Sequence, residues 1–173
     1  MFDAEVLAAA RAVIDANRAA GLTVCTAESC TGGLVAGALT EIAGASDVLE
    51  RGFVTYSNEA KLETLGVNIH ILETFGAVSV AVAWAMAQGA LVHSHADVAV
   101  AITGIAGPGG GSAMKPVGTV VFARARRGED PDVVVADTKC FGDLGRSEIR
   151  RQAALVALEL LMPAGTAVVT PAG

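Results

Sequence analysis

The sequence has few charged and few aromatic residues. Asp, Glu, Lys and Arg make up 17% of its 173 residues, and Phe, Trp and Tyr only 4%. Hydrophobic residues account for 53%, which is enough apolar side chain to form a packed core, so intrinsic disorder is excluded. The 18 acidic residues outnumber the 12 basic ones, giving a net charge of −6. A general nucleic-acid binder would need a basic face, and this composition argues against that class of function.

Cysteine is scarce as well. Cys25, Cys30 and Cys140 form no Cys-x-x-Cys pair and no even set for disulfides, so reduced thiols in a cytoplasmic protein explain them best. Asp3 and Glu5 stand where a secretory signal would carry Lys or Arg, and we infer no export. The longest apolar run, 77–92, is shorter than the roughly 20 residues that a membrane span needs. We therefore expect a cytoplasmic protein without a membrane segment.

Short apolar runs separated by glycine are abundant, with 20 glycines in the chain. Strands are predicted at 22–25, 48–56, 97–103, 118–126 and 133–141, and helices at 3–20, 34–42, 58–65, 69–75, 80–92 and 147–161. This alternation predicts an α/β fold, a three-layer α/β/α domain with a mixed, mainly parallel sheet whose last two strands form an antiparallel hairpin. We expect one domain over 1–173, with its core at about 3–162 and a loose tail at 163–173.

A polar segment, Thr26-Ala27-Glu28-Ser29-Cys30-Thr31-Gly32-Gly33, separates the first strand from the next helix. We predict that it is a strand-to-helix turn, which places a hydroxyl and free backbone N–H groups where open α/β sheets bind ligands. Ser29 then has two interpretations, as a cap for the helix or as a nucleophile that a nearby base activates. Cys30 has no basic neighbour in the sequence and is expected to be a small buried residue.

The best candidate for the base lies in Tyr56-Ser57-Asn58-Glu59-Ala60-Lys61, which ends the second strand and opens a short helix with Asn58 as the expected N-cap. Tyr56 and Lys61 can both face the crevice beside Ser29. A lysine that burial leaves neutral can accept the serine proton. The alternative interpretation is a solvated lysine and a surface tyrosine.

A glycine-rich loop at 104–111 follows the third strand, but it matches neither of the glycine motifs that bind ATP or dinucleotides. It is either a flexible loop or a wall of the substrate pocket, in which Thr103 and the N–H groups of Gly104 and Ile105 face a phosphate or ribose. The N–H groups of Gly32 and Gly33 are candidates for holding a phosphate or an oxyanion.

Arg146 and Arg150, one helical turn apart, either reach an anion or form a solvated face. His93 and His95 are read as a polar helix end, and no metal ligand or cofactor is expected.

Five segments carry a resemblance to a known family: the polar segment 26–33, the segment 56–61, Ile102 to Gly110, Lys115 to Val120, and Arg146-x-x-Ile149-Arg150. In this order they resemble the motifs of the CinA C-terminal domain family, whose members are known as nicotinamide-nucleotide amidohydrolases. In one place the chain differs. The family pattern Phe-x-Gly-Asp-Arg corresponds here to Phe141-Gly142-Asp143-Leu144-Gly145-Arg146, which is one residue longer.

The resemblance implies a Ser-Lys amidohydrolase that deamidates nicotinamide mononucleotide to nicotinate mononucleotide and ammonia. It implies catalytic roles for Ser29, Lys61 and Tyr56, and a small nucleotide as the ligand. Substrate contacts are expected from Thr31, Gly32, Gly33, Thr103, Gly104, Ile105 and Arg146. The alternatives are a non-catalytic nucleotide-binding or partner-docking module and a hydrolase of another small amide. The apolar helices and low charge also predict a homo-oligomer.

Overall fold

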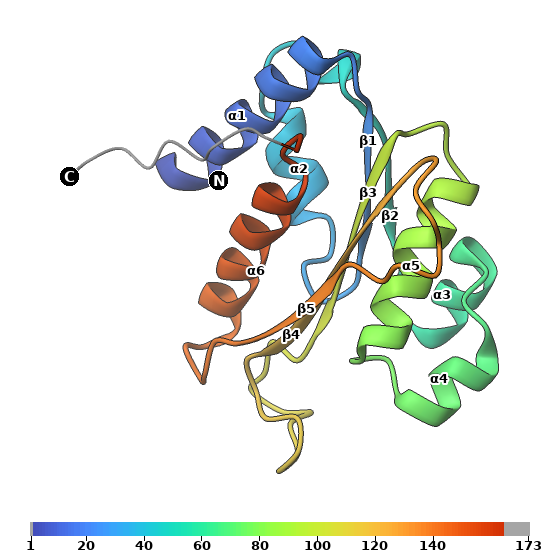
Figure 1. The fold of residues 1–173 in the computed structure, drawn as a ribbon. Coiled ribbons are helices and arrows are strands. Elements are labelled where there is room, and N and C mark those ends of the chain that lie inside the picture. Colours follow the sequence, from blue (N-terminus) through green and yellow to red (C-terminus); the bar gives the residue numbers. More distant parts are fainter. Residues whose placement is uncertain (1, 165–173) are drawn as a thin grey trace.

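The computed structural model describes residues 2–164, and it shows a sheet covered by helices on both faces (Figure 1). The strands are β1 Val24–Glu28, β2 Leu49–Val54, β3 Val98–Gly104, β4 Thr119–Arg126 and β5 Ala136–Cys140. The helices are α1 Ala4–Ala20, α2 Leu34–Thr40, α3 Asn58–Leu65, α4 Ile69–Phe75, α5 Val80–Val92 and α6 Arg146–Leu160, with a 3-10 turn at Ala45–Asp47. Of the tail that was expected to be loose, 165–173 lie outside the described residues.

The five strands lie in the order β2-β1-β3-β4-β5. β1 pairs in parallel with both β2 and β3, whereas β4 is antiparallel to both β3 and β5. β4 is therefore the one strand of this sheet that runs against the rest. The prediction of a three-layer α/β/α fold with a mixed sheet and a final antiparallel hairpin is confirmed.

Each face of the sheet has its own apolar core. Val24, Val100 and Phe122 pack toward the layer of α1, α2 and α6, while Cys25 and Val121 pack toward the layer of α3, α4 and α5. Because both faces are covered, the middle strand β3 is apolar without interruption from Val98 to Ile102. No helix within residues 2–164 combines the length and the apolar character that crossing a membrane requires.

Most helix ends follow the sequence signals. The Asp3 carboxylate accepts the Val6 N–H at 2.9 Å and so caps α1, and Gly21 ends that helix with a φ of 67°. Ser79 caps α5 as predicted. The cap of α3 was predicted wrongly as Asn58. The hydroxyl of the preceding residue, Ser57, accepts the Ala60 N–H at 3.0 Å, so Asn58 is the first residue of the helix.

The first strand is longer than expected. We predicted that the whole segment 26–33 is a turn, but Thr26, Ala27 and Glu28 belong to β1. This stretch pairs with β2 on one side and β3 on the other, and its polar side chains are fully buried. The turn is consequently confined to 29–33. The last strand is shorter than predicted because Val133 and Val134 lie outside it, in an exposed connection.

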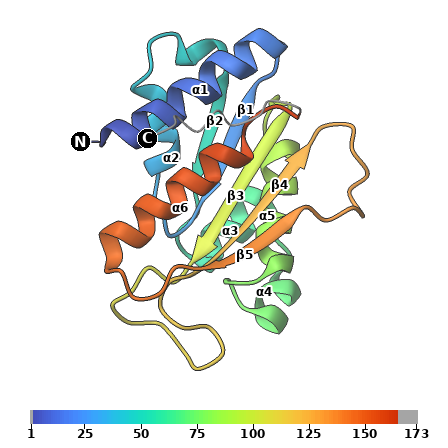
Figure 2. The same cartoon turned by 60° about the vertical axis from the view of Figure 1, so that its left-hand side comes forward.

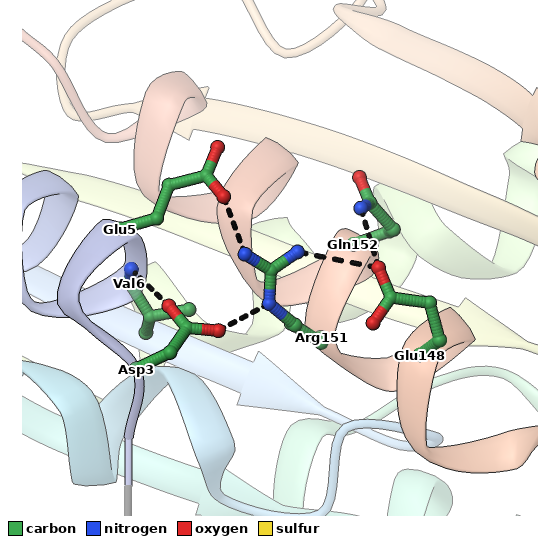
Figure 3. Close-up of polar contacts among 6 residues, drawn as sticks. All are labelled: Asp3, Glu5, Val6, Glu148, Arg151 and Gln152. Carbon is green, nitrogen blue, oxygen red and sulfur yellow. Dashed lines mark hydrogen bonds and ion pairs between the residues drawn. The ribbon is translucent and has the colours of Figure 1, made fainter.

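Helices α1 and α6 lie together across one face of the sheet (Figure 2). Arg151 of α6 joins their starts through ion pairs with Asp3, Glu5 and Glu148, and Gln152 donates to the same Glu148 carboxylate at 2.7 Å (Figure 3). The first turns of α6 are thereby fastened to the beginning of the chain. The same turns of α6 carry Arg146 and Arg150, which reach the region described next.

Candidate active site

A pocket of about 260 Å³ opens at the carboxyl ends of β1 and β3. It is lined by Ser29, Cys30, Tyr56, Lys61, Ala77, Val78, residues 103–107, Gly109, Gly110 and Arg146. A larger hollow of about 490 Å³ lies along residues 40–49, but no charged side chain lines it. Acid-base chemistry needs titratable groups, so the smaller pocket is the candidate active site.

Ser29 and Lys61 meet inside this pocket. Lys61 Nζ lies 3.0 Å from Ser29 Oγ, and the two side chains are 1% and 9% exposed respectively. Lys61 Nζ also donates to the Thr55 carbonyl at 2.7 Å and, more weakly, to the Tyr56 carbonyl at 3.5 Å. Burial lowers the pKa of Lys61 from its usual 10.5. The interpretation of Lys61 as a solvated surface lysine is therefore wrong.

The Lys61 amine has three oxygen neighbours, the Ser29 hydroxyl and the carbonyls of Thr55 and Tyr56. The charged form donates one N–H bond to each of them. In the neutral form the two carbonyls take the two N–H bonds, and the lone pair is left for the Ser29 hydroxyl, 3.0 Å away. Within residues 2–164, Lys61 makes no ion pair with a carboxylate that would hold it in its charged form. Ser29 and Lys61 thus lie within hydrogen-bonding distance, as a serine nucleophile and its base would have to.

The local structure explains why Lys61 reaches Ser29. β2 lies beside β1 in parallel, and the Thr55 N–H donates to the Glu28 carbonyl at 2.8 Å, just past the end of the strand. The chain then turns, and the Ser57 cap starts α3 with Lys61 in its first turn. Lys61 therefore points back over the edge of the sheet where β1 gives way to Ser29.

Cys30, next to Ser29, is 5% exposed. Burial raises the pKa of its thiol to about 11, so it stays protonated at neutral pH and is a poor nucleophile. This agrees with its expected place as a small buried residue.

Some backbone N–H groups of the turn are used in hydrogen bonds within the protein, and others are not. The Gly32 N–H donates to the Ser29 carbonyl at 3.0 Å, and the Gly33 N–H donates to the Glu28 carboxylate at 3.0 Å. Neither amide is available to a ligand in this structure, and neither glycine nor Thr31 lines the pocket. Among residues 2–164 the N–H groups of Cys30 and Thr31 donate to no backbone carbonyl, and both lie near the Cys30 thiol. Of these two residues only Cys30 lines the pocket, so its N–H is the amide of the turn that remains for an oxyanion.

Thr103, Gly104 and Ile105 form a wall of the pocket, as one of the two interpretations expected. Their polar groups are largely occupied. The Thr103 hydroxyl donates to the Ala77 carbonyl at 2.9 Å, and the Ile105 N–H donates to the Thr119 carbonyl at 2.8 Å. They therefore shape the pocket more than they offer donors to a ligand.

The mouth of the pocket is formed by Tyr56 and Arg146. Arg146 Nη2 donates to the Tyr56 hydroxyl at 2.7 Å, and its Nη1 donates to the Gly107 carbonyl at 2.8 Å. The Tyr56 hydroxyl bonds to neither Ser29 nor Lys61, so this residue meets Lys61 through its backbone carbonyl. Arg146 reaches the pocket even though its segment is one residue longer than the family pattern.

Sequence reasoning missed two residues that hold the Ser29 turn. Glu28 was assigned to the turn itself, but it is a buried strand residue whose carboxylate accepts backbone N–H groups of the turn and of α2. Arg150 was expected to bind an anion or face solvent, but it donates to the carbonyls of Cys30 and Thr31. A charged residue at the end of an apolar strand was the available signal for Glu28. Arg150 had no comparable signal.

Residues 2–164 contain no group of three or more His, Cys, Asp or Glu side chains placed to hold a metal ion.

Comparisons with known proteins agree with the resemblance in the sequence. The model of the CinA C-terminal domain family matches residues 7–164. The chain is 53% identical, over 163 residues, to a protein of Escherichia coli K12 named nicotinamide-nucleotide amidohydrolase PncC, covering 93% of this chain and 95% of that one. A protein of the same name from Enterobacter agglomerans is 54% identical over 144 residues, covering 83% and 85%.

Solved structures give the same result. The crystal structure of a competence/damage inducible protein from Agrobacterium tumefaciens superposes with a TM-score of 0.89 at 54% identity, covering 93% of this chain and 96% of that one. A competence damage-inducible protein from Klebsiella pneumoniae superposes with a TM-score of 0.84 at 36% identity, covering 91% and 94%.

Proposed function

This chain belongs to the CinA C-terminal domain family, and from that premise we propose that it hydrolyses the carboxamide of nicotinamide mononucleotide, yielding nicotinate mononucleotide and ammonia. The observation that carries the proposal is the buried contact of 3.0 Å between Lys61 Nζ and Ser29 Oγ. The substrate is taken from the name of relatives that match nearly the whole chain at 53% identity. The cytoplasmic location and the homo-oligomer stay predictions from the sequence.

In the first half of the proposed reaction, neutral Lys61 accepts the Ser29 proton while Oγ attacks the carboxamide carbon. The carbonyl oxygen becomes an oxyanion, which the N–H group of Cys30 stabilises. Lys61, now charged, returns the proton to the departing nitrogen. Ammonia leaves, and the nicotinoyl group remains as an ester on Ser29.

In the second half, a water molecule takes the place of ammonia. Lys61 accepts one proton from it, the hydroxide oxygen attacks the ester carbon, and Lys61 passes that proton to Ser29 Oγ as the bond to the acyl group breaks. The carboxylic acid that is released gives the second proton of the water to solvent and becomes the carboxylate. Each proton that Lys61 accepts is returned within the same half-reaction. Lys61 and Ser29 therefore end the reaction in the protonation states in which they began it.

The charges of the pocket suit a nucleotide monophosphate. Arg146 supplies a positive charge to the pocket lining, Lys61 is neutral when it acts as the base, and no carboxylate is among the lining residues. The Arg146 guanidinium lies at the mouth, away from Ser29, where a planar set of donors can bind a phosphate. We propose that Arg146 holds the phosphate while the carboxamide faces Ser29.

The test is release of ammonia from nicotinamide mononucleotide without added metal or ATP, by the native chain and by Ser29→Ala and Lys61→Ala. Matched controls are Ser46→Ala and Lys139→Ala, which change an exposed serine and an exposed lysine outside the pocket. We expect the first two variants to be inactive and the controls to keep native turnover. A native chain that binds the nucleotide without turning it over contradicts the proposal and indicates a binding module. Turnover confined to a different amide contradicts the substrate alone.

A further inference from the structure

Glu28 holds the Ser29 turn from behind. Its side chain is fully buried, and Oε2 accepts the N–H groups of Gly33 at 3.0 Å and Val35 at 3.2 Å. Oε1 accepts the Ala36 N–H at 2.9 Å and the Thr26 hydroxyl at 3.2 Å. The amides at the start of a helix have no partner within the helix, so this carboxylate supplies acceptors for three of them.

Arg150 holds the same turn from the opposite side. From α6, its Nε donates to the Cys30 carbonyl at 3.0 Å and its Nη2 donates to the Thr31 carbonyl at 2.9 Å. A guanidinium presents these donors in one rigid plane, so the two bonds fix the direction of both carbonyls together. The Glu28 carboxylate thus binds amides of the turn and of α2, and the Arg150 guanidinium binds carbonyls of the turn.

These carbonyl bonds also set the direction of backbone amides of the turn. The Cys30 carbonyl and the Thr31 N–H belong to one planar trans peptide group, so they point in opposite directions. When Arg150 fixes the carbonyl, the Thr31 N–H is directed away from α6. The next peptide group is fixed at both ends, because Arg150 binds the Thr31 carbonyl and the Gly32 N–H donates to the Ser29 carbonyl.

Neither charged side chain is itself in the pocket, because the lining includes neither Glu28 nor Arg150. Their hydrogen bonds are to the protein, so they act on a bound substrate only through the backbone of 29–33. We propose that Glu28 and Arg150 are positioning residues that fix Ser29 Oγ and the Cys30 amide of the turn relative to each other. This proposal rests on the proposed function, since it assumes that Ser29 is the nucleophile.

A positioning role differs from a merely structural one in what it changes. Displacing reacting groups by about 1 Å lowers a rate by about 100-fold, while the walls that bind substrate stay in place. Replacing Arg150 should therefore lower kcat and leave KM nearly unchanged. A residue needed only for stability would lower the melting temperature, and the turnover of each folded molecule would stay native.

The experiment compares Arg150→Lys with Arg151→Lys. The two residues are neighbours on α6, but Arg151 binds carboxylates at the start of α1 and does not touch the turn (Figure 3). Lysine keeps the charge and loses the paired, planar donors. We expect Arg150→Lys to lower kcat by about 10-fold to 100-fold, which corresponds to a displacement of the reacting groups of the order of 1 Å or less. Arg151→Lys should change kcat less than about twofold. Circular dichroism and the melting temperature establish that both are folded.

A second readout does not depend on the identity of the substrate. A fluorophosphonate reagent phosphonylates Ser29 with loss of fluoride, and intact-mass measurements give the rate of labelling. Ser29→Ala serves as the unlabelled reference. We expect Arg150→Lys to label at least 10-fold more slowly than the native chain and Arg151→Lys to label at the native rate. If Arg150→Lys does not fold, Arg150→Gln, which retains one donor to the turn, takes its place.

The possible outcomes separate the two proposals. Native labelling and native kcat in a folded Arg150 variant overturn the positioning role and leave Ser29 as the nucleophile. In a second outcome the native chain is labelled normally but does not hydrolyse nicotinamide mononucleotide, and the Arg150 variant is labelled slowly. That outcome supports the positioning role and overturns only the substrate. A native chain that neither labels nor releases ammonia overturns both.

Discussion

Arg146 donates a 2.7 Å hydrogen bond to the hydroxyl of Tyr56, which joins the start of α6 to the end of β2 across the mouth of the pocket. Gly145, with a φ of 81°, precedes Arg146 and turns the chain into the helix. The extra residue of this segment therefore lies in a loop before α6 and does not keep Arg146 from the pocket.

The first prediction concerns Arg146. If its guanidinium binds the substrate phosphate, Arg146→Ala should raise KM for nicotinamide mononucleotide by about 10-fold or more, the value of one charge-assisted hydrogen bond. KM for nicotinamide riboside, which lacks the phosphate, should change little. Steady-state kinetics with both substrates measure this. Arg11→Ala, an exposed residue of α1, is the control, and equal effects on both substrates would contradict phosphate binding.

The second prediction is the direction of the pH dependence of kcat/KM. Proton transfer needs neutral Lys61, so activity should rise with pH through the pKa of Lys61 and then level off. Because burial lowers that pKa, the midpoint of the rise should lie below 10.5. Lys61→Arg should be inactive across the range, since a guanidinium does not lose its proton. Activity that falls with pH over this range would argue against Lys61 as the base.

The third prediction links the same pKa to stability. The folded pKa of Lys61 lies below its unfolded value, so the free energy of unfolding is lower below the folded pKa and rises as pH increases toward 10.5. The gain is about 1.4 kcal/mol for each unit of lowering. Urea unfolding of the native chain and of Lys61→Met at several pH values measures it. As pH rises, the free energy of unfolding of the native chain should increase relative to that of Lys61→Met. A difference that stays constant with pH would contradict the lowered pKa.

The fourth prediction concerns the contact between α3 and α5. A Cβ at Gly89 would lie 2.0 Å from the Leu65 carbonyl oxygen, and backbone has little room to move away. Gly89→Ala should destabilise the fold by about 3 kcal/mol, the upper range for an overfilled core. Gly37→Ala, in helix α2, is the control, because its Cβ would meet only the Phe2 ring at 3.2 Å. We expect the control to change the free energy of unfolding by less than about 1 kcal/mol.

The fifth prediction concerns the thiols. Cys25 and Cys30 are buried, and burial raises the pKa of each to about 11, whereas Cys140 is exposed. Iodoacetamide at neutral pH should therefore alkylate Cys140 first, and the modified chain should keep its activity. Peptide mass spectrometry after timed labelling identifies the modified residue. Early modification of Cys30 accompanied by loss of activity would contradict this.

Much of the fold followed from local signals in the sequence. Asp3, Gly21, Gly66 and Ser79 mark helix ends because caps act on backbone groups only a few residues away. The error at Glu28 has a physical reason. A polar residue at the end of an apolar run is usually read as a turn, whereas here the ladder with β2 and β3 extends the strand and buries the carboxylate.

The site was predictable in part. The residue types that suit serine-lysine chemistry could be found by their place beside strand ends, and Ser29 and Lys61 do meet. Their surroundings could not be found in this way. Glu28 decides which amides of the turn remain free. Arg150 decides how the carbonyls of the turn are oriented, and it is 120 residues away from Cys30 in the sequence. Contacts at that separation are set by how the layers pack and leave no local pattern.

The pocket draws its residues from almost the full length of the described chain, with Ser29 after β1, Lys61 in α3, Thr103 in β3 and Arg146 in α6. Circular dichroism reports the helices whether or not the layers have assembled. Catalysis would instead require the first strand, the middle of the sheet and the last helix to be docked at once. After dilution from urea, the recovered activity would therefore measure the fraction of molecules in which all layers have docked. Its rate of recovery would be the rate of the slowest docking step.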